Sequence, residues 1–328
     1  MRMSALPGRA VLVALGAVLS ACGAVPADEV SHQAALSSVP QSALSGAPQG
    51  AGAPEIISHR TNPHFDGAIT VGGTGVVTPA ITYGGGPLIG SPTVYVIWYG
   101  NWNQTNGSDT PAGQQIVRDF ANSIGGSPYF GINTTYSAGG TTITGQVSFG
   151  GETTDTGSRG KRLRDGDILT IVNSSISTGK LPYDASGVYF VLTSSDVAEV
   201  SGFCSKYCGW HTAATPSSGH VRYSFVGNAN RCLSGCAAQT ISPNANAGVD
   251  GMISVIAHEL EEAATDPDPR SGWTDSNGAE NADKCAWTFG NYSTLPSGAA
   301  YNMTLGTRNY LIQRNLKHAT SGDTCQLQ

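Results

Sequence analysis

A short segment of the chain carries side chains that can bind a metal ion. Residues 257–267 read AHELEEAATDP, so His258 and Glu262 are four residues apart. Two residues at this spacing lie on the same face of a helix, and both side chains can therefore reach one cation. Glu259 follows the histidine and is placed to contact a metal-bound water as a general base. The segment predicts a metal site with one candidate catalytic residue.

The segment is similar to the H-E-x-x-H motif of zinc hydrolases, with Glu262 in the place of the second histidine. In zincins with an extended motif a third ligand follows six residues later, and Asp268 stands at that position. Asp266 is an alternative because a proline breaks the helix between the two, and His211 and Glu280 are candidates from other segments. One histidine with two carboxylates makes a harder site than a histidine-rich one. We expect a divalent cation, with zinc as the first choice and calcium or manganese as alternatives.

A later segment and a structural alternative also bear on this site. The segment ENADKCAW supplies three oxygen donors that a disulfide at Cys285 would hold nearby, namely Glu280, Asn281 and Asp283. The structural alternative needs no metal: the three glutamates of HELEE form a solvated acidic face and His258 makes a hydrogen bond in the core. His258 follows the apolar residues MISVI, however, and a polar ring on a buried face needs a partner. This placement favours a functional site.

The elements that position these residues follow from hydrophobic patterning. Apolar residues recur at helical spacing from Met252 to Ala263, which predicts a helix that begins at Asp250 as its cap and ends before Pro267. Residues 93–100 (TVYVIWYG) predict a strand buried on both faces. TPAGQQIVRDFANSIG predicts a helix on the sheet, and TTITGQVSFGG, GVYFVLTSSDV and HVRYSFVGN predict further strands. Together they predict an α/β fold: a mixed twisted sheet with packed helices in one zincin-like, disulfide-bonded domain.

The N-terminal residues predict export. Residues 1–21 carry two arginines and then an apolar run that ends at LSAC, which resembles a bacterial lipoprotein signal peptide with Cys22 as the lipidated N-terminus. An ordinary secretory signal is the alternative. Residues 22–60 are rich in Ala, Ser, Gly and Pro, which is typical of a flexible tether. We expect a signal peptide (1–21), a tether (22–60) and a folded domain (61–328), exported and either lipid-anchored at the cell envelope or secreted.

Charge and cysteine count narrow the class of protein. The formal net charge is −6, which argues against nucleic acid as a partner. Six cysteines follow Cys22, and an even number in an exported chain predicts three disulfides. We favour Cys285 bonded to Cys325, with the cysteines of CSKYC and CLSGC bonded within each pair or between the pairs. The alternative is a zinc site formed by the four cysteines of these two pairs.

Five segments resemble the EXORDIUM family of phosphate-induced secreted proteins. They are GGPLIGSPTVYVIWYGNW, GVYFVLTSSDVAEVSGFCSKYCGWH, YSFVGNANRC, SVIAHELEEAATDPDPRSGW and GAENADKCAWTFG, and they lie in order from about residue 83 to Cys325. The resemblance implies a secreted or cell-surface, disulfide-bonded protein that is connected in plants with growth and cell expansion. It implies no well-established enzymatic activity. The lipoprotein-like signal departs from the plant pattern.

Two hypotheses of function follow. The first is a surface-anchored, metal-dependent, peptidase-like hydrolase that acts on a cell-wall or extracellular polypeptide. Its ligands are His258, Glu262 and Asp268 or Asp266, and its general base is Glu259. The second is a non-catalytic cell-surface protein on a protease-like scaffold. We expect a monomer under either hypothesis.

An aromatic segment, WYGNWN, is the other candidate for binding. Its first two aromatic residues belong to the predicted buried strand. Trp102 lies in the polar loop that follows, and we expect it to be exposed and available to stack on sugar rings.

Overall fold

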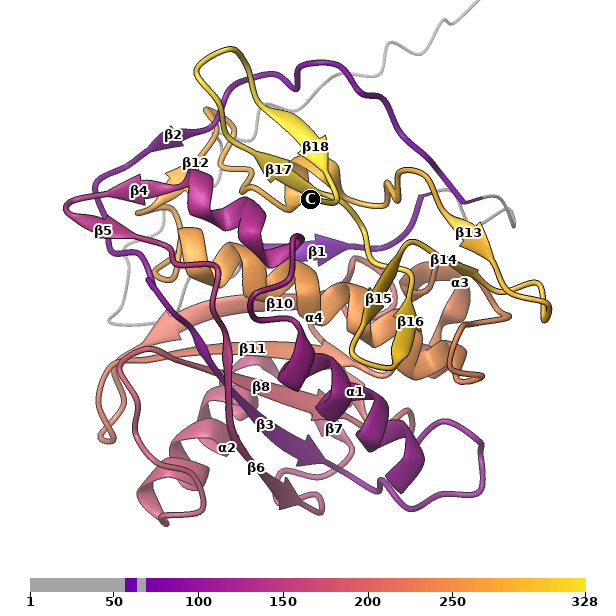
Figure 1. Ribbon diagram of the computed structural model, residues 1–328. Coiled ribbons are helices and arrows are strands. Elements are labelled where there is room, and N and C mark those ends of the chain that lie inside the picture. Colours follow the sequence, from indigo (N-terminus) through magenta and orange to yellow (C-terminus); the bar gives the residue numbers. More distant parts are fainter. Residues whose placement is uncertain (1–56, 64–68) are drawn as a thin grey trace, which may run out of the picture. The chain divides into compact units, whose positions relative to one another are not determined.

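The computed structural model describes residues 57–63 and 69–328 (Figure 1). The predicted signal peptide (1–21) and the lipidated Cys22 lie outside the described residues, as does the tether up to residue 56. β1 (Ile57–Arg60) begins inside the range 22–60 that we assigned to the tether. Within the described ranges, we find no helix with the length and apolar character that a membrane crossing requires.

A mixed sheet lies at the centre of the folded part, as the sequence predicted, and it has six strands. The strands follow the order β1-β10-β11-β8-β3-β6. β6, β3, β8 and β11 are parallel, and β10 runs antiparallel to its neighbours β1 and β11. The central strands β3 and β8 are buried over almost their whole length, because their apolar runs are covered on both faces. The strand bounds are β3 Thr93–Tyr99, β6 Ser148–Asp155, β8 Gly187–Thr193, β10 Tyr207–Ala214 and β11 Val221–Gly227.

Three longer helices pack on this sheet: α1 (Pro111–Ser123), α2 (Asp165–Ser177) and α4 (Ala247–Thr265). The chain passes from β3 through α1 to β6, then returns through α2 to β8 on the other side of β3. Since crossovers between parallel strands are right-handed, this reversal places α1 and α2 on opposite faces of the sheet. α4 packs against α1, β10 and β11, as Figure 1 shows. The shorter helices are α3 Leu233–Cys236, η2 Phe130–Thr135, η3 Ala229–Arg231 and η4 Asp283–Cys285.

α4 carries the HELEE segment and is buried on every side. All its residues from Gly248 to Thr265 are buried, which contradicts the alternative of a solvated acidic face. The predicted cap at its start was wrong by four residues. Asn246 is the cap, because its side chain accepts a hydrogen bond from Val249 N at 3.2 Å. The Asp250 carboxylate instead accepts hydrogen bonds from the backbone and side chain of Asn244.

Replacing this cap should loosen the start of α4. The Asn246 side chain also donates to the Ser108 carbonyl at 3.1 Å, so it joins the helix to the loop before α1. We expect Asn246→Ala to lower the free energy of unfolding by about 1 kcal/mol, the usual value for a lost helix cap. Chemical denaturation followed by circular dichroism measures this. A loss well below about 0.5 kcal/mol would show that the cap contributes little.

Three disulfides connect distant parts of the chain. Cys204 is bonded to Cys232 and Cys208 to Cys236, each across 28 residues of sequence. The CSKYC and CLSGC pairs are therefore bonded to each other, which excludes the four-cysteine zinc site. Cys285 is bonded to Cys325 across 40 residues, as predicted.

Short two-stranded pairings organise the segments around the main sheet. β2 pairs with β12, β4 with β5, β7 with β9, β13 with β14, β15 with β16, and β17 with β18. Their bounds are β2 Thr82–Tyr83, β4 Ser137–Ala138, β5 Thr141–Thr142, β7 Arg162–Leu163, β9 Ala198–Glu199, β12 Trp273–Thr274, β13 Ser293–Thr294, β14 Ala300–Tyr301, β15 Met303–Leu305, β16 Arg308–Tyr310, β17 Asn315–Lys317 and β18 Thr324–Gln326.

The prediction of an exposed Trp102 was wrong. Only 5% of this residue is exposed, and its ring packs edge-on against Trp98. Its indole N–H donates to the Leu192 carbonyl at 3.3 Å, so a loop residue contributes to the core. This segment offers no platform for sugar rings.

Candidate metal centre

The three predicted residues of HELEE lie side by side in the interior. His258, Glu259 and Glu262 are each 0% exposed. A buried carboxylate is costly unless an opposite charge or hydrogen bonds compensate it. The surroundings of α4 must therefore supply that compensation.

One group of potential ligands comes from three different elements. It contains His211 of β10, Glu262 of α4 and Glu280 of the loop before η4, and the ligand atoms all lie within 4.8 Å of one another. His211 Nδ1 is 3.6 Å from Glu262 Oε2, and His211 Nε2 is 3.7 Å from Glu280 Oε1. All three side chains are buried. The sequence had named His211 and Glu280 only as alternatives.

A second group shares Glu262 with the first. It contains His258, Glu262 and Asp283. His258 Nε2 lies 2.9 Å from Glu262 Oε1 and 3.6 Å from Asp283 Oδ1. The Asp283 side chain is 22% exposed, so this group reaches towards solvent. Glu262 thus directs one carboxylate oxygen to each group.

Several oxygen atoms of these carboxylates have no hydrogen-bond partner among the described residues. They are Glu262 Oε2, Glu259 Oε1 and both carboxylate oxygens of Glu280. Buried polar atoms are almost always satisfied, so the unpartnered oxygens of Glu262 and Glu280 in one ligand group indicate a place for a water or an ion. The donor set of imidazole and carboxylate fits a divalent transition metal.

The pKa values of these buried residues also indicate that the carboxylates need a cation. Burial raises the pKa of Glu262 to about 7, although the neighbouring His258 opposes this. Burial, together with the Glu262 and Asp266 carboxylates, raises the pKa of Glu280 well above its usual value. Burial alone would lower the pKa of His258, but the adjacent Glu262 raises it well above its usual value. The carboxylates repel one another, and a cation between them would remove that repulsion.

A family model described as "Phosphate-induced protein 1 conserved region" matches residues 81–326. The chain belongs to this family, the EXORDIUM family. It is 32% identical to Protein EXORDIUM-like 3 of Arabidopsis thaliana over 282 residues, which covers 74% of this chain and 81% of that relative. It is 32% identical to Protein EXORDIUM-like 5 of the same plant, over 57% of this chain and 58% of that relative. It is 27% identical to tobacco Protein PHOSPHATE-INDUCED 1, over 56% of this chain and 63% of that relative. These plant relatives lend no support to a bacterial origin.

No solved structure matches this EXORDIUM-family chain. The fold class, a mixed sheet with few helices, therefore rests on the structure of this chain. The likeness to zincins rests on the HELEE segment alone.

Asp268, the first choice for the third ligand, lies away from both groups. Its carboxylate accepts hydrogen bonds from His220 Nε2 at 2.9 Å and Arg222 Nε at 3.1 Å. The extended motif predicted it near the site, but the loop that follows α4 after Thr265 holds it beside His220 and Arg222. The structure does not bring Asp268 to the cluster.

Asp266, the second choice, lies beside the cluster but is engaged elsewhere. Its carboxylate accepts hydrogen bonds from the backbone N–H groups of Arg270, Ser271 and Gly272 at 2.6, 2.9 and 2.5 Å. It therefore closes the loop that follows α4. Its backbone carbonyl lies 3.3 Å from His211 Nε2. Since Glu259 contacts Nδ1 of the same ring, the contact with this carbonyl must give way when Nε2 binds a cation.

Two residues that contact the ring nitrogens of His211 and His258 orient these imidazole rings. Glu259 Oε2 lies 3.2 Å from His211 Nδ1, and the Gln313 amide lies 2.6 Å from His258 Nδ1. Such outer contacts select the tautomer of a metal-binding histidine and fix its orientation. The atom next to His258 Nδ1 is the amide nitrogen of Gln313, which also donates to the Ala282 carbonyl. For His258 Nε2 to bind a cation, Nδ1 must carry the proton, so this amide must turn its oxygen towards Nδ1.

Sequence reasoning missed one histidine of this EXORDIUM-family domain. His59 of β1 is buried, and its ring centroid lies 4.0 Å from that of His258. Burial lowers its pKa well below the usual value, with His258 as a further cause. The segment IISHR was assigned to the tether, although its two isoleucines were a signal for the first strand.

Proposed function

We propose that this domain binds a divalent cation in a closed site, and that the cation stabilises an exported protein without catalysing a reaction. The ligands are His211, Glu262 and Glu280, with His258 and Asp283 on the other side of Glu262. The observation that carries the proposal is the set of unpartnered carboxylate oxygens of Glu262 and Glu280 facing His211 in the interior. Zinc is the first candidate, because an imidazole ligand suits zinc better than calcium.

Burial favours a stabilising role over a catalytic one. Catalytic zinc sites keep one coordination position open to substrate, whereas structural sites are closed by protein ligands. The side chains of Glu262 and Glu280 are 0% exposed. A cation among them would join β10, α4 and the loop before η4, which lie far apart in sequence. The exported location and the membrane attachment through Cys22 rest on the pattern of residues 1–22.

A metal-dependent, peptidase-like hydrolase is the second candidate. It is favoured by the position of Glu259, whose Oε1 has no partner among the described residues and whose Oε2 contacts His211. That arrangement suits a general base next to a metal-bound water. Substrate would have to approach past Asp283, the half-buried ligand.

Metal analysis of the intact protein tests the first proposal. We expect protein purified without chelator to contain about one equivalent of zinc or manganese per chain. A chelator should lower the melting temperature, and adding the metal should restore it. His211→Ala should lose both the metal and the response to it. His220→Ala removes a half-exposed histidine whose ring hydrogen-bonds to Thr215 and Asp268; it is the control and should keep both the metal and the response.

Two outcomes decide between the candidates. A protein without metal that shows no change in melting temperature with zinc, manganese or calcium contradicts both. Casein hydrolysis that disappears with chelator, and that falls by about 100-fold in Glu259→Gln with the metal retained, would establish the hydrolase instead.

A further inference from the structure

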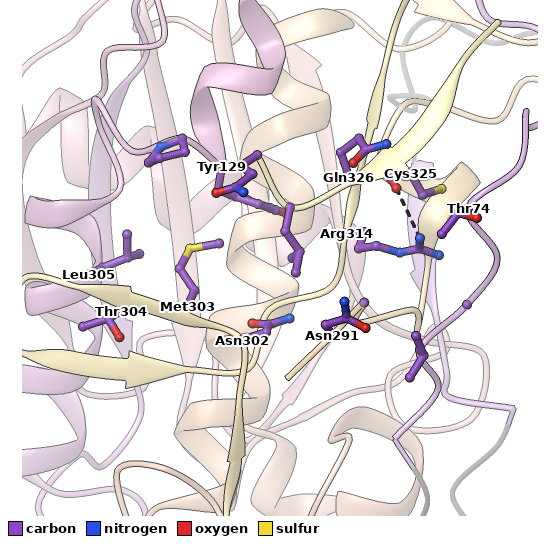
Figure 2. A pocket seen from close by; sticks show the side chains of 16 residues that line it. Thr74, Tyr129, Asn291, Asn302, Met303, Thr304, Leu305, Arg314, Cys325 and Gln326 are labelled. Atoms are coloured by element: carbon purple, nitrogen blue, oxygen red, sulfur yellow. Dashed lines mark hydrogen bonds between the residues drawn. The ribbon is translucent and has the colours of Figure 1, made fainter. Parts of the chain in front are cut away.

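A surface cavity of about 520 Å³ is lined by none of the proposed metal ligands. Figure 2 shows its walls, which come from the segment before β2, the loop after η4, and the strands β15 and β18. A volume of this size fits a small organic molecule and exceeds what a simple inorganic ion fills. Most of the polar residues that line it are neutral.

The exception is Arg314, which is 5% exposed. Its Nε donates to Thr288 Oγ1 at 3.1 Å, and its Nη1 donates to the carbonyls of Gly73 and Cys325 at 2.7 and 3.2 Å. All three acceptors are uncharged. Within the described residues, no carboxylate forms an ion pair with this guanidinium. A buried cation without an opposite charge is unusual, because burial of a charge is compensated by a counter-charge or a ligand.

The geometry leaves one nitrogen of Arg314 available to the cavity. An arginine has five N–H donors, and the contacts above do not use the two on Nη2. Gly72 makes room for this nitrogen, since a Cβ on Gly72 would lie 2.2 Å from Nη2. The guanidinium is therefore held by the backbone on one side and offers two charged donors on the other. A carboxylate is the natural partner for such donors.

A second, shallower depression of about 180 Å³ continues from the cavity. The two share Asn291, Asn302, Met303 and Thr304. Tyr292, which is 42% exposed, and Tyr301 line the far end of this depression. Asn302 and Thr304 are engaged with Phe289, Ile312 and Asn309. Asn291 is therefore the amide that suits the hydroxyls of a sugar, and the exposed ring of Tyr292 suits its apolar face.

We propose that this surface binds an acidic oligosaccharide in which one hexuronic acid is linked to a neutral sugar. The carboxylate of the uronic acid binds Arg314 Nη2, and the neutral sugar lies against Tyr292. One cation in the cavity and a net charge of −6 on the chain disfavour a ligand with many negative charges. This site is independent of the metal centre and of its function.

The test compares two matched ligands. Cellobiouronic acid and cellobiose differ only by a carboxylate in place of a hydroxymethyl group. By titration calorimetry at low salt, we expect the acid to bind at least about tenfold more tightly, the value of one charge-assisted hydrogen bond. Equal affinity for the two, or no binding of either, overturns the proposal. Displacement of the acid by an equal concentration of inorganic phosphate also overturns it, because the site would then be a general anion site.

Substitutions at the rim keep the fold intact. Thr74 is exposed, follows Gly73 and lies beside Arg314 in Figure 2. Thr74→Asp supplies an internal carboxylate and should weaken binding of cellobiouronic acid by about tenfold or more, whereas Thr74→Asn is the uncharged control and should bind as the wild type does. Tyr292→Ala should weaken binding of cellobiouronic acid but not of glucuronate alone. Unchanged binding in Thr74→Asp refutes the role of Arg314, and unchanged binding in Tyr292→Ala refutes the second sugar site.

Discussion

Glu262→Gln is expected to lower the affinity for a divalent cation by about 100-fold or more. Glutamine keeps the shape of the side chain but is a poor metal ligand, and Glu262 is the residue that belongs to both ligand groups. Loss of a ligand should lower metal affinity by more than the 10- to 100-fold that follows the loss of a residue hydrogen-bonded to a ligand. At a metal concentration about 1,000 times the dissociation constant, binding stabilises the folded state by about 4 kcal/mol, and this contribution would disappear.

Without metal the substitution should also destabilise the protein. Glu262 Oε1 lies 2.9 Å from His258 Nε2, and, against the effect of burial, this carboxylate raises the pKa of that histidine. Removing one partner of a buried pair leaves the other uncompensated, so the free energy of unfolding of the metal-free protein should fall by about 3 kcal/mol. Denaturation curves with metal and with chelator measure both effects on the same preparation.

The neighbouring glutamate provides the control. Glu261 is equally buried, but its Oε2 accepts a hydrogen bond from Asn315 at 2.6 Å and it belongs to neither ligand group. Burial raises the pKa of Glu261 well above its usual value, so glutamine resembles the protonated form. Glu261→Gln should leave metal affinity unchanged. If both substitutions shift stability equally and neither depends on metal, the cluster is a set of buried polar residues and not a metal centre.

Removal of the Cys285–Cys325 disulfide should destabilise the protein by about 4 kcal/mol, since the bond closes a loop of 40 residues. The paired substitutions Cys285→Ala and Cys325→Ala make this change without leaving a free thiol. Cys285 ends η4, which begins at the ligand Asp283 and follows Glu280 closely. We therefore also expect a tenfold or larger loss of metal affinity, in the range for lost outer support.

The Cys204–Cys232 disulfide separates the two effects. It closes 28 residues and should be worth a similar amount of stability, about 3–4 kcal/mol. It does not hold the loop of Glu280 and Asp283, so Cys204→Ala with Cys232→Ala should leave metal affinity unchanged. A loss of affinity in this control would mean that general destabilisation, and not the position of η4, governs metal binding.

Local patterns were enough to predict much of the fold. The apolar run of residues 93–100 identified a central strand, and helical spacing identified α4 with Pro267 beyond its end. The pairing of Cys285 with Cys325 was favoured because an even number of cysteines follows the predicted signal peptide and the other four form the pairs CSKYC and CLSGC. These features depend on neighbouring residues or on simple counting, which a single sequence contains.

The complete ligand set could not be predicted in the same way. Spacing along a helix placed His258 and Glu262 together, but the chain leaves the helix after Thr265, so Asp268 points to His220 instead. His211 and Glu280 come from segments that only the tertiary fold brings together. Their separation along the chain contains no local signal for a contact.

The reversal of direction between α1 and α2 has a consequence for ligand binding. In sheets with helices on both faces, such a reversal creates a topological switch point at the carboxyl ends of the parallel strands, where ligands commonly bind. Here the loop after β3 fills this crevice: Asp109 is buried and accepts hydrogen bonds from Ser195 N at 2.9 Å, after β8, and from Asn228 Nδ2 at 2.6 Å, after β11. The loop after β3 is therefore tied to the segments after β8 and β11 at the edge of the sheet where such folds commonly bind ligands, and a ligand could enter there only if these hydrogen bonds broke.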